Sequence, residues 1–190
     1  MKGIVLCGGK SSRMGTDKAL ITHKGKTCLE NTMALFDALS LAYVVSCNAQ
    51  QHLSYTHFVP SEKIVIDQNK YAGPMRGLMS CYENYPQDLF LLACDMPDIY
   101  IPHLQALIDL YENDPYYDAY LYRKHSFYEP LCAIYTQKGL EKIRYKIDPY
   151  EGNFSFQKLL QKELRTKTIS LTDAEASFLK NYNYKEDWAL

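Results

Sequence analysis

Residues 6–18 combine the residue types that bind a nucleoside triphosphate. The segment reads LCGGKSSRMGTDK and follows a short apolar run at residues 4–6. Gly8 and Gly9 let the backbone approach an anion closely and leave successive amide groups free to donate to phosphate oxygens. Arg13 and Lys18 supply positive charge where the chain would close over those phosphates. The segment therefore predicts a phosphate-binding loop with two catalytic cations.

The spacing of the glycines excludes two well-known nucleotide motifs. Residues 9–11 and 25–27 each resemble the end of a P-loop, but the glycine required five positions earlier is replaced by Ile4 and Leu20. The G-x-G-x-x-G spacing of dinucleotide-binding enzymes is also absent. An isolated pair of glycines is more often an ordinary turn beside a solvated basic face, so spacing alone leaves that alternative open.

A second feature is the carboxylate at Asp95. It follows the apolar residues 89–93 directly, and Pro97 ends the extended run. Mg²⁺ is a hard ion that takes one or two carboxylates together with phosphate oxygens, and it neutralises charge that gathers on a reacting phosphate. Asp95 is therefore the predicted Mg²⁺ ligand and a catalytic residue. The alternative, a carboxylate that caps the following helix, suits Asp98 better.

The surrounding sequence alternates between strand-like and helix-like patterns. Short apolar runs predict strands at residues 4–6, 43–45, 64–66, 89–93, 119–122 and 131–135. Helical spacing predicts helices at residues 28–39, 74–85, 104–111 and 156–164. This alternation is typical of a mostly parallel sheet covered on both faces. We predict one three-layer, Rossmann-like α/β domain over residues 1–190.

The unusual polar and glycine positions follow the first four predicted strands. In open sheets of this kind, ligands bind outside the carboxyl ends of the strands. The segments after those strands contain residues 8–18, Asn48, Asp67 with residues 73–77, and Asp95. We therefore expect one site at this edge of the sheet.

Composition limits the partners of the protein. The formal net charge is −1, which gives no global field to attract nucleic acid or an anionic membrane. The apolar start of the chain is too short for a signal peptide or a membrane span, so we expect a cytoplasmic protein. The six cysteines form no C-x-x-C pair and are expected to be small buried hydrophobes.

Several of these segments together resemble a known family. The first matches L-x-G-G-x-x-x-R-M-G-x-D-K, a signature of nucleotidyltransferases that share the nucleotide-diphospho-sugar transferase-like fold. Asn48, Asp67, the GPMRGL run at residues 73–78, the CDMP run at residues 94–97 and the tail at residues 181–187 narrow the resemblance. Over nearly its whole length the chain resembles the molybdenum cofactor guanylyltransferases.

The resemblance implies a reaction and a set of site residues. Enzymes of this family transfer GMP from GTP to molybdopterin and release pyrophosphate. It implies backbone contacts to GTP from Leu6, Cys7 and Gly8, phosphate binding by Lys18, nucleoside contacts from Asn48 and Asp67, and Mg²⁺ as the cofactor on Asp95. It also implies transient contact with molybdoenzymes or other proteins of cofactor synthesis.

Some positions depart from the family pattern. Arg76 stands where small or apolar residues are common, Tyr184 and Lys185 replace a Thr-Pro pair, and Glu129 replaces a basic residue before Pro130. These positions are expected to face the pterin. For Arg76, a phosphate contact and a place on a helix surface are equal alternatives.

Two other functions stay open at this stage. One is another nucleotidyltransferase of the same fold that uses CTP, acting on molybdopterin or on a sugar or polyol phosphate. The other is a non-catalytic nucleotide-binding module. The combination of Arg13, Lys18 and Asp95 favours an enzyme over such a module.

Overall fold

The computed structural model describes residues 1–8, 17–147, 155–183 and 185–188. Four parallel strands form one half of a sheet: β1 (Lys2–Leu6), β4 (Tyr43–Cys47), β5 (Ile64–Ile66) and β6 (Leu89–Ala93). Their valine, isoleucine and leucine side chains are mostly buried, as expected for strands covered on both faces.

Three further strands extend the sheet beyond β6. They are β7 (Ala119–Lys124), β8 (Phe127–Tyr135) and β9 (Thr166–Leu171), and the strand order is β5-β4-β1-β6-β8-β7-β9. β8 runs antiparallel to β6 and β7, whereas β9 pairs with β7 in parallel. The prediction of a mostly parallel sheet is confirmed. β8 is the exception: its second half, from Cys132 to Tyr135, pairs with β6 in the antiparallel sense, and its first residues pair with β7.

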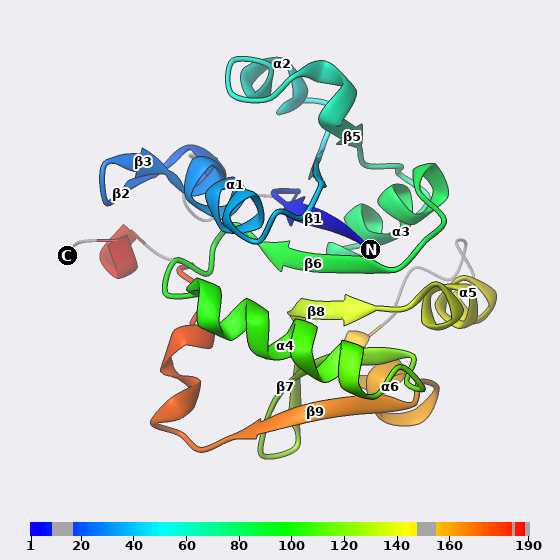
Figure 1. Ribbon diagram of the computed structural model, residues 1–190. Helices are drawn as coiled ribbons and strands as arrows, with labels where there is room; N and C mark the ends of the chain where they lie inside the picture. Colours follow the sequence, from blue (N-terminus) through cyan, green and yellow to red (C-terminus); the bar gives the residue numbers. More distant parts are fainter. Residues whose placement is uncertain (9–16, 148–154, 184, 189–190) are drawn as a thin grey trace.

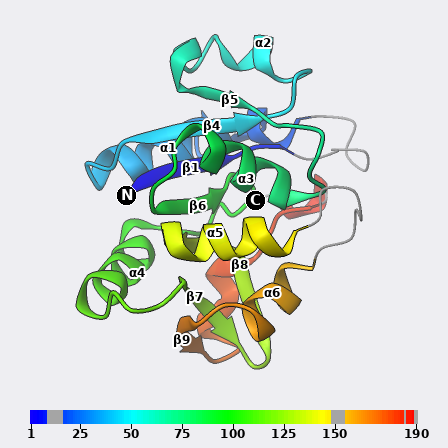
Figure 2. The same cartoon turned by 90° about the vertical axis from the view of Figure 1, so that its right-hand side faces the viewer.

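Helices cover both faces of the sheet (Figures 1 and 2). The first face is covered by α1 (Cys28–Ala38) and α4 (Ile101–Asn113), and the second by α3 (Pro74–Asn84), α5 (Gln137–Lys146) and α6 (Phe156–Lys162). Leu29 and Leu104 pack in the first core, and Leu78 and Leu140 in the second. These layers make the predicted three-layer α/β domain.

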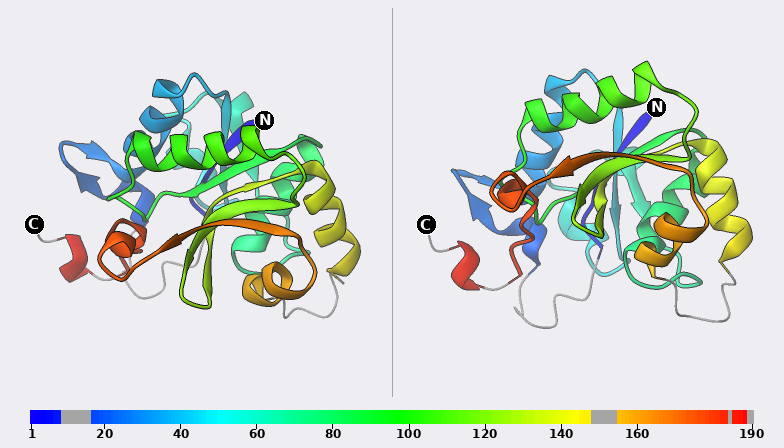
Figure 3. Two further views of the ribbon diagram at one scale, coloured as in Figure 1. Left: turned by 60° about the horizontal axis from the view of Figure 1, so that its bottom comes forward. Right: turned by 90° about the horizontal axis from the view of Figure 1, so that it is seen from below.

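Short elements occupy the connections. They are the hairpin of β2 (Thr22–His23) and β3 (Lys26–Thr27), helix α2 (His52–Tyr55), and the 3-10 turns η1 (Lys18–Leu20), η2 (Ser61–Lys63), η3 (Glu175–Leu179) and η4 (Lys185–Trp188). The segment after β9 returns to lie beside the β2–β3 hairpin, where His23 contacts the rings of Tyr182 and Trp188 (Figure 3). The C-terminal tail thereby reaches the edge at which β1 and β6 end.

Apart from the short elements in the connections, α5 and β9 were not predicted, because both contain few apolar residues. In α5 the sequence is dominated by charged and polar residues, and only Gly139, Leu140 and Ile143 are buried. β9 is an edge strand whose residues are half-buried or exposed, so its TKTISL sequence lacks a strong strand pattern.

The six cysteines are all free and buried, as the sequence predicts. In the part of the chain that the structure describes, no helix combines the length and apolar character needed to cross a bilayer.

Candidate functional site

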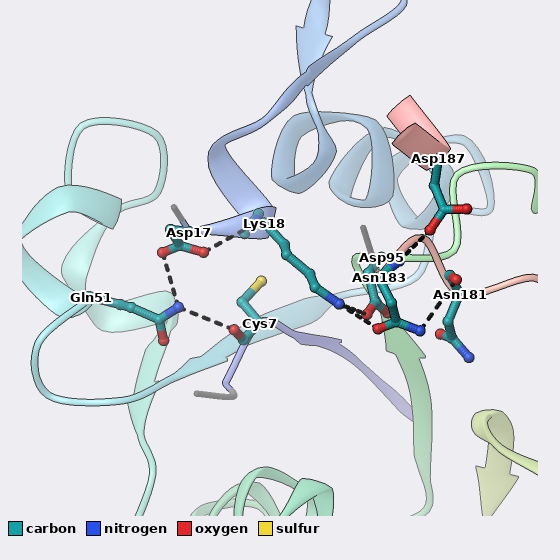
Figure 4. Close-up of polar contacts among 9 residues, drawn as sticks. Cys7, Asp17, Lys18, Gln51, Asp95, Asn181, Asn183 and Asp187 are labelled. Carbon is teal, nitrogen blue, oxygen red and sulfur yellow. Dashed lines mark hydrogen bonds and ion pairs between the residues drawn. The ribbon is translucent and has the colours of Figure 1, made fainter. Parts of the chain in front are cut away.

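Lys18 and Asp95 meet at the carboxyl edge of the sheet, although they are far apart in the sequence. Lys18 begins η1, a turn capped by the Asp17 carboxylate, which accepts from the Ala19 N–H at 3.1 Å. The Lys18 Nζ lies 3.0 Å from Asp95 Oδ2 and 2.6 Å from Asn183 Oδ1 (Figure 4). The fold thus brings together the predicted phosphate-binding cation and the predicted metal ligand.

Backbone contacts on both sides hold Asp95. Its predecessor Cys94 donates from its backbone N–H to the Leu6 carbonyl at 3.2 Å, which extends β6 along β1. The Asp95 carbonyl accepts from the Tyr182 N–H at 2.8 Å, so the tail joins the site there. Asp98 does not cap the following helix, because Tyr100 is the N-cap of α4. The Asp98 carboxylate instead accepts from the Tyr182 hydroxyl at 2.9 Å.

Asn183 is held so that its carboxamide oxygen faces Lys18. Its backbone N–H donates to Asp187 Oδ2 at 2.9 Å, and its Nδ2 donates to the Asn181 carbonyl at 3.3 Å. Two hard oxygen atoms, one from Asp95 and one from Asn183, therefore converge on one cation. This donor set is of the kind that Mg²⁺ prefers.

Asn48 and Gln51 form a reciprocal pair after β4. The Asn48 Oδ1 accepts from the backbone N–H groups of Gln50 and Gln51 at 2.9 and 3.1 Å. The Asn48 N–H in turn donates to Gln51 Oε1 at 3.1 Å. Because the oxygen of the Asn48 carboxamide is engaged, its Nδ2 amino group is the part available to donate to a ligand.

Asp67 lies against the end of β1. Its Oδ1 accepts from the Ser46 hydroxyl at 2.6 Å, and its backbone N–H donates to the Cys47 carbonyl at 2.8 Å. A Cβ at Gly8 would collide with the Asp67 carboxylate, so only glycine permits this approach. Burial raises the pKa of Asp67, opposed by the Ser46 hydrogen bond and by the charge of Arg76.

Arg76 is close to this part of the site. Its Nε donates to the Tyr71 carbonyl at 2.8 Å, and its positive charge acts on the Asp67 carboxyl. The side chain is therefore tied to the protein near Asp67. A phosphate contact for Arg76 stays a prediction.

The backbone groups of Leu6 and Cys7 already make contacts within the protein. The Leu6 carbonyl accepts from Cys94, the Cys7 N–H donates to the Ser46 carbonyl at 3.0 Å, and the Cys7 carbonyl accepts from Gln51 Nε2 at 3.2 Å. A carbonyl oxygen has a second lone pair. The predicted nucleotide contacts at these two residues would therefore use that second position on each carbonyl.

Glu129 is a buried carboxyl beside Asp95, and it is one of the positions that depart from the family pattern. Leu92 pairs with Cys132 in the sheet, and Glu129 precedes Cys132 in β8, close enough to the residues after β6 for the Asp95 charge to act on its carboxyl. Glu129 is only 8% exposed, and its Oε1 accepts from the Leu131 N–H at 2.9 Å. Burial raises the pKa of Glu129 to about 7; the Leu131 N–H opposes this shift and the Asp95 charge adds to it.

Two of the predicted site residues, Gly9 and Arg13, lie outside the described residues, as does Tyr184. Two residues of the site were not predicted. Asn183 belongs to the tail motif that supports the family resemblance, so a signal for it was present in the sequence. Gln51 belongs to no motif, and only the folded structure shows its contacts.

The family model described as the MobA-like NTP transferase domain matches residues 3–166. The probable molybdenum cofactor guanylyltransferase of Nostoc sp. is 32% identical over 193 residues, covering 100% of this chain and 89% of that protein. A molybdenum cofactor biosynthesis bifunctional protein of Synechocystis sp. is 31% identical over 142 residues, which cover 73% of this chain but only 40% of that longer protein.

A solved structure shares the fold. The crystal structure of molybdopterin-guanine dinucleotide biosynthesis protein A from Archaeoglobus fulgidus superposes with a TM-score of 0.77 at 21% identity, covering 99% of this chain and 95% of that one. At that identity the likeness supports the fold alone. The match of the family model over most of the chain, together with the full-length relative, shows that this protein is a nucleotidyltransferase and belongs to the MobA-like NTP transferase family.

Proposed function

We propose that the protein transfers GMP from GTP to molybdopterin in a Mg²⁺-dependent reaction. An oxygen of the terminal phosphate of molybdopterin forms a bond to the α-phosphorus of GTP. The bond from that phosphorus to the oxygen bridging the α- and β-phosphates breaks, and pyrophosphate leaves with the electron pair. This chemistry needs no nucleophile from the protein. It depends on positioning and on charge stabilisation.

The observation that carries the proposal is the place of the Lys18 ammonium between Asp95 and Asn183. Nζ lies 3.0 Å from the carboxylate oxygen and 2.6 Å from the carboxamide oxygen. Oxygens that converge on the protein's own cation fit a hard metal ion, so Asp95 and Asn183 would hold Mg²⁺. When bound, the ion would neutralise charge that gathers on the α-phosphate.

Lys18 and Arg13 are the proposed phosphate-binding cations. An ammonium on a flexible side chain can follow the phosphates of an incoming nucleotide and leave the carboxylate free. Gly8 and Gly9 would let the backbone approach those phosphates. The glycine at position 8 is already required by the close approach of Asp67.

The nucleoside would lie across the ends of β1, β4 and β5. Guanine presents a carbonyl beside ring N–H and amino donors, so the Asn48 Nδ2 group can donate to the carbonyl and main-chain carbonyls such as those of Leu6 and Cys7 can accept from the donors. A carboxylate such as Asp67 can accept from a ribose hydroxyl. The name of the relative from Nostoc, a probable molybdenum cofactor guanylyltransferase, supports the choice of guanine and of the molybdenum cofactor as acceptor.

The proposed catalytic unit is the whole domain, residues 1–190. Its N-terminal half would provide the nucleotide-binding loop, and Asn183 from the tail would complete the metal site. Partners that receive the finished cofactor would be molybdoenzymes or other proteins of cofactor synthesis, in transient contact.

The test is pyrophosphate release by the purified protein with molybdopterin and Mg²⁺. GTP, CTP and ATP are compared at equal concentrations, and GTP should be strongly preferred. A preference for CTP would favour a cytidylyltransferase instead. Tight nucleotide binding without pyrophosphate release would indicate a non-catalytic module.

The metal role is tested with Asp95→Ala, and Asp109→Ala at an exposed position of α4 is the control. Asp95→Ala should lose Mg²⁺-dependent pyrophosphate release by a factor of about 10² to 10³ or more, by analogy with other electrostatic stabilisers, while the fold stays intact. Asp109→Ala should behave as the wild type. Unchanged release in the Asp95 variant would contradict the metal role.

A further inference from the structure

Gln51 connects three parts of the site that are separate in the sequence. Its Nε2 donates to the Cys7 carbonyl at 3.2 Å and to Asp17 Oδ2 at 2.9 Å. Its Oε1 accepts from the Asn48 N–H at 3.1 Å. One side chain therefore contacts the end of β1, the residue before Lys18 and the residue after β4, as Figure 4 shows for the first two contacts.

The surroundings of Gln51 determine which way its carboxamide points. The groups beside its nitrogen are acceptors: a carbonyl oxygen from Cys7, a carboxylate from Asp17, and the Tyr55 hydroxyl oxygen at 3.1 Å. The group beside its oxygen is a donor N–H from Asn48. A carboxamide turned the other way would place an oxygen against a carbonyl and a carboxylate, which is unfavourable.

The same contacts orient Asn48. The backbone N–H of Gln51 donates to Asn48 Oδ1, while the Gln51 side chain accepts from the Asn48 N–H, so each residue holds the other. With its oxygen engaged, the Asn48 carboxamide presents the Nδ2 donor to a ligand. A donor at this position favours a base with a carbonyl, such as guanine, over adenine, which carries an amino group and no carbonyl.

Asp17 is the second residue whose position depends on the Gln51 side chain. Its Oδ2 accepts from Gln51 Nε2 at 2.9 Å, and the Tyr55 hydroxyl lies 3.1 Å from Oδ1 and 2.9 Å from Oδ2. The same carboxylate caps the turn that begins with Lys18. Removal of the Gln51 carboxamide therefore changes the support of both the base side and the phosphate side of the nucleotide.

We infer that Gln51 is a positioning residue that sets the affinity and base preference of the nucleotide site through Asn48, Cys7 and Asp17. The inference rests on the proposed function, since it takes GTP as the preferred nucleotide. Gln51 acts on the nucleotide half of the site, so the affinity for the acceptor does not depend on it.

The experiment is calorimetric titration of the intact protein with GTP, ATP and CTP in the presence of Mg²⁺. The variants are Gln51→Ala and Gln51→Glu, and the control is Gln50→Ala, whose side chain is exposed while its backbone N–H is kept. Thermal unfolding of each variant is measured in parallel. The ratio of GTP to ATP affinity is the main readout, because a fraction of unfolded protein does not alter it.

Gln51→Ala should weaken GTP binding about tenfold, the equivalent of about one hydrogen bond, and should lower the ratio of GTP to ATP affinity. Gln51→Glu should weaken it more, although the side chain keeps its size, because a carboxylate would face Asp17 and the Cys7 carbonyl. In the double variant Gln51→Glu with Asp17→Asn, the amide nitrogen at position 17 can donate to the carboxylate at position 51, so the hydrogen bond is restored in the opposite direction. The double variant should recover part of the loss.

The inference is overturned if Gln51→Ala matches Gln50→Ala, or if all three nucleotides weaken equally so that the ratio is unchanged. It is also overturned if, in the pyrophosphate-release assay of Gln51→Ala, the Michaelis constant for molybdopterin changes as much as the Michaelis constant for GTP. Failure of the proposed function looks different: the wild type would then prefer another nucleotide or release no pyrophosphate, while the effect of Gln51 on binding of the preferred nucleotide would still be measured.

Discussion

The Lys18 ammonium lies 3.0 Å from the Asp95 carboxylate, across 77 positions of the sequence. Both side chains keep about a fifth of their surface exposed, so the pair is accessible to a ligand. A positive group therefore lies where the proposed Mg²⁺ would bind. Binding of nucleotide phosphates would draw the ammonium away and release the carboxylate for the ion, so nucleotide and metal should bind cooperatively.

Lys18→Met tests this relationship. The variant should lose pyrophosphate release by about 10² to 10³, because a charge that stabilises the phosphates is gone. In the absence of nucleotide, however, it should bind Mg²⁺ more tightly than the wild type, because no ammonium competes for Asp95. Calorimetric titration with MgCl₂ measures this, and Lys26→Met, at an exposed position of the β2–β3 hairpin, serves as the control. Weaker Mg²⁺ binding by Lys18→Met would contradict the competition.

Asn48→Asp tests whether the Asn48 side chain contacts the nucleotide base. The substituted carboxylate can still accept from the two backbone N–H groups, but it lacks the Nδ2 donor. GTP affinity should fall about tenfold or more, since a guanine carbonyl would face a carboxylate oxygen. ATP and CTP should fall less or improve, because their amino groups can donate. Equal weakening of all three nucleotides would exclude a contact between Asn48 and the base edge.

Gly77→Ala tests the close approach of α3 to the sheet. A Cβ at position 77 would collide with the Leu6 side chain and the Ser46 hydroxyl, which also holds Asp67. Glycine to alanine normally stabilises a helix by up to about 1 kcal/mol. Here the variant should instead be destabilised by about 1 to 3 kcal/mol, the usual cost of overpacking. Urea unfolding measures the change, and a gain in stability would show that the neighbours move aside readily.

Glu129→Gln tests the buried carboxyl beside Asp95. The pKa of Glu129 is raised from 4.5 to about 7 in the folded protein, so folding favours its protonated form. The wild type should therefore lose stability as the pH rises from about 4.5 to about 7, by a total of about 3 kcal/mol. The amide variant stays neutral and can still accept from the Leu131 N–H, so it should not show this loss.

Urea unfolding at pH 5 and pH 8 in metal-free buffer gives the comparison. Glu129→Gln should gain stability over the wild type mainly at pH 8. The other groups near Glu129 are the Asp95 carboxylate and the Cys132 and Tyr135 side chains, and burial raises the pKa of each of the last two well above its ordinary value. Glu112→Gln, at an exposed position of α4, is the control. An equal difference at both pH values would show that the gain is not linked to ionisation.

The sequence by itself determined the class of fold and much of the site. Apolar runs such as residues 89–93 have the buried, strand-forming character that the sheet requires, and the rule that ligands bind at the carboxyl ends of parallel strands placed Asn48, Asp67 and Asp95 at one edge. The sequence also predicted that the backbone at Gly8 approaches another group closely. It did not predict that Asp67 is the group that lies against Gly8 in the fold.

Only the tertiary structure decided which of these residues contact each other. Strand order and the return of the chain after β9 decide whether Lys18 reaches Asp95 and whether Asn183 joins them. They also decide whether Gln51 links Cys7 to Asp17. Local patterns report how a residue is buried along its own helix or strand. They hold no information on the partner that a polar side chain meets from a distant strand, because that contact exists only after the layers have packed.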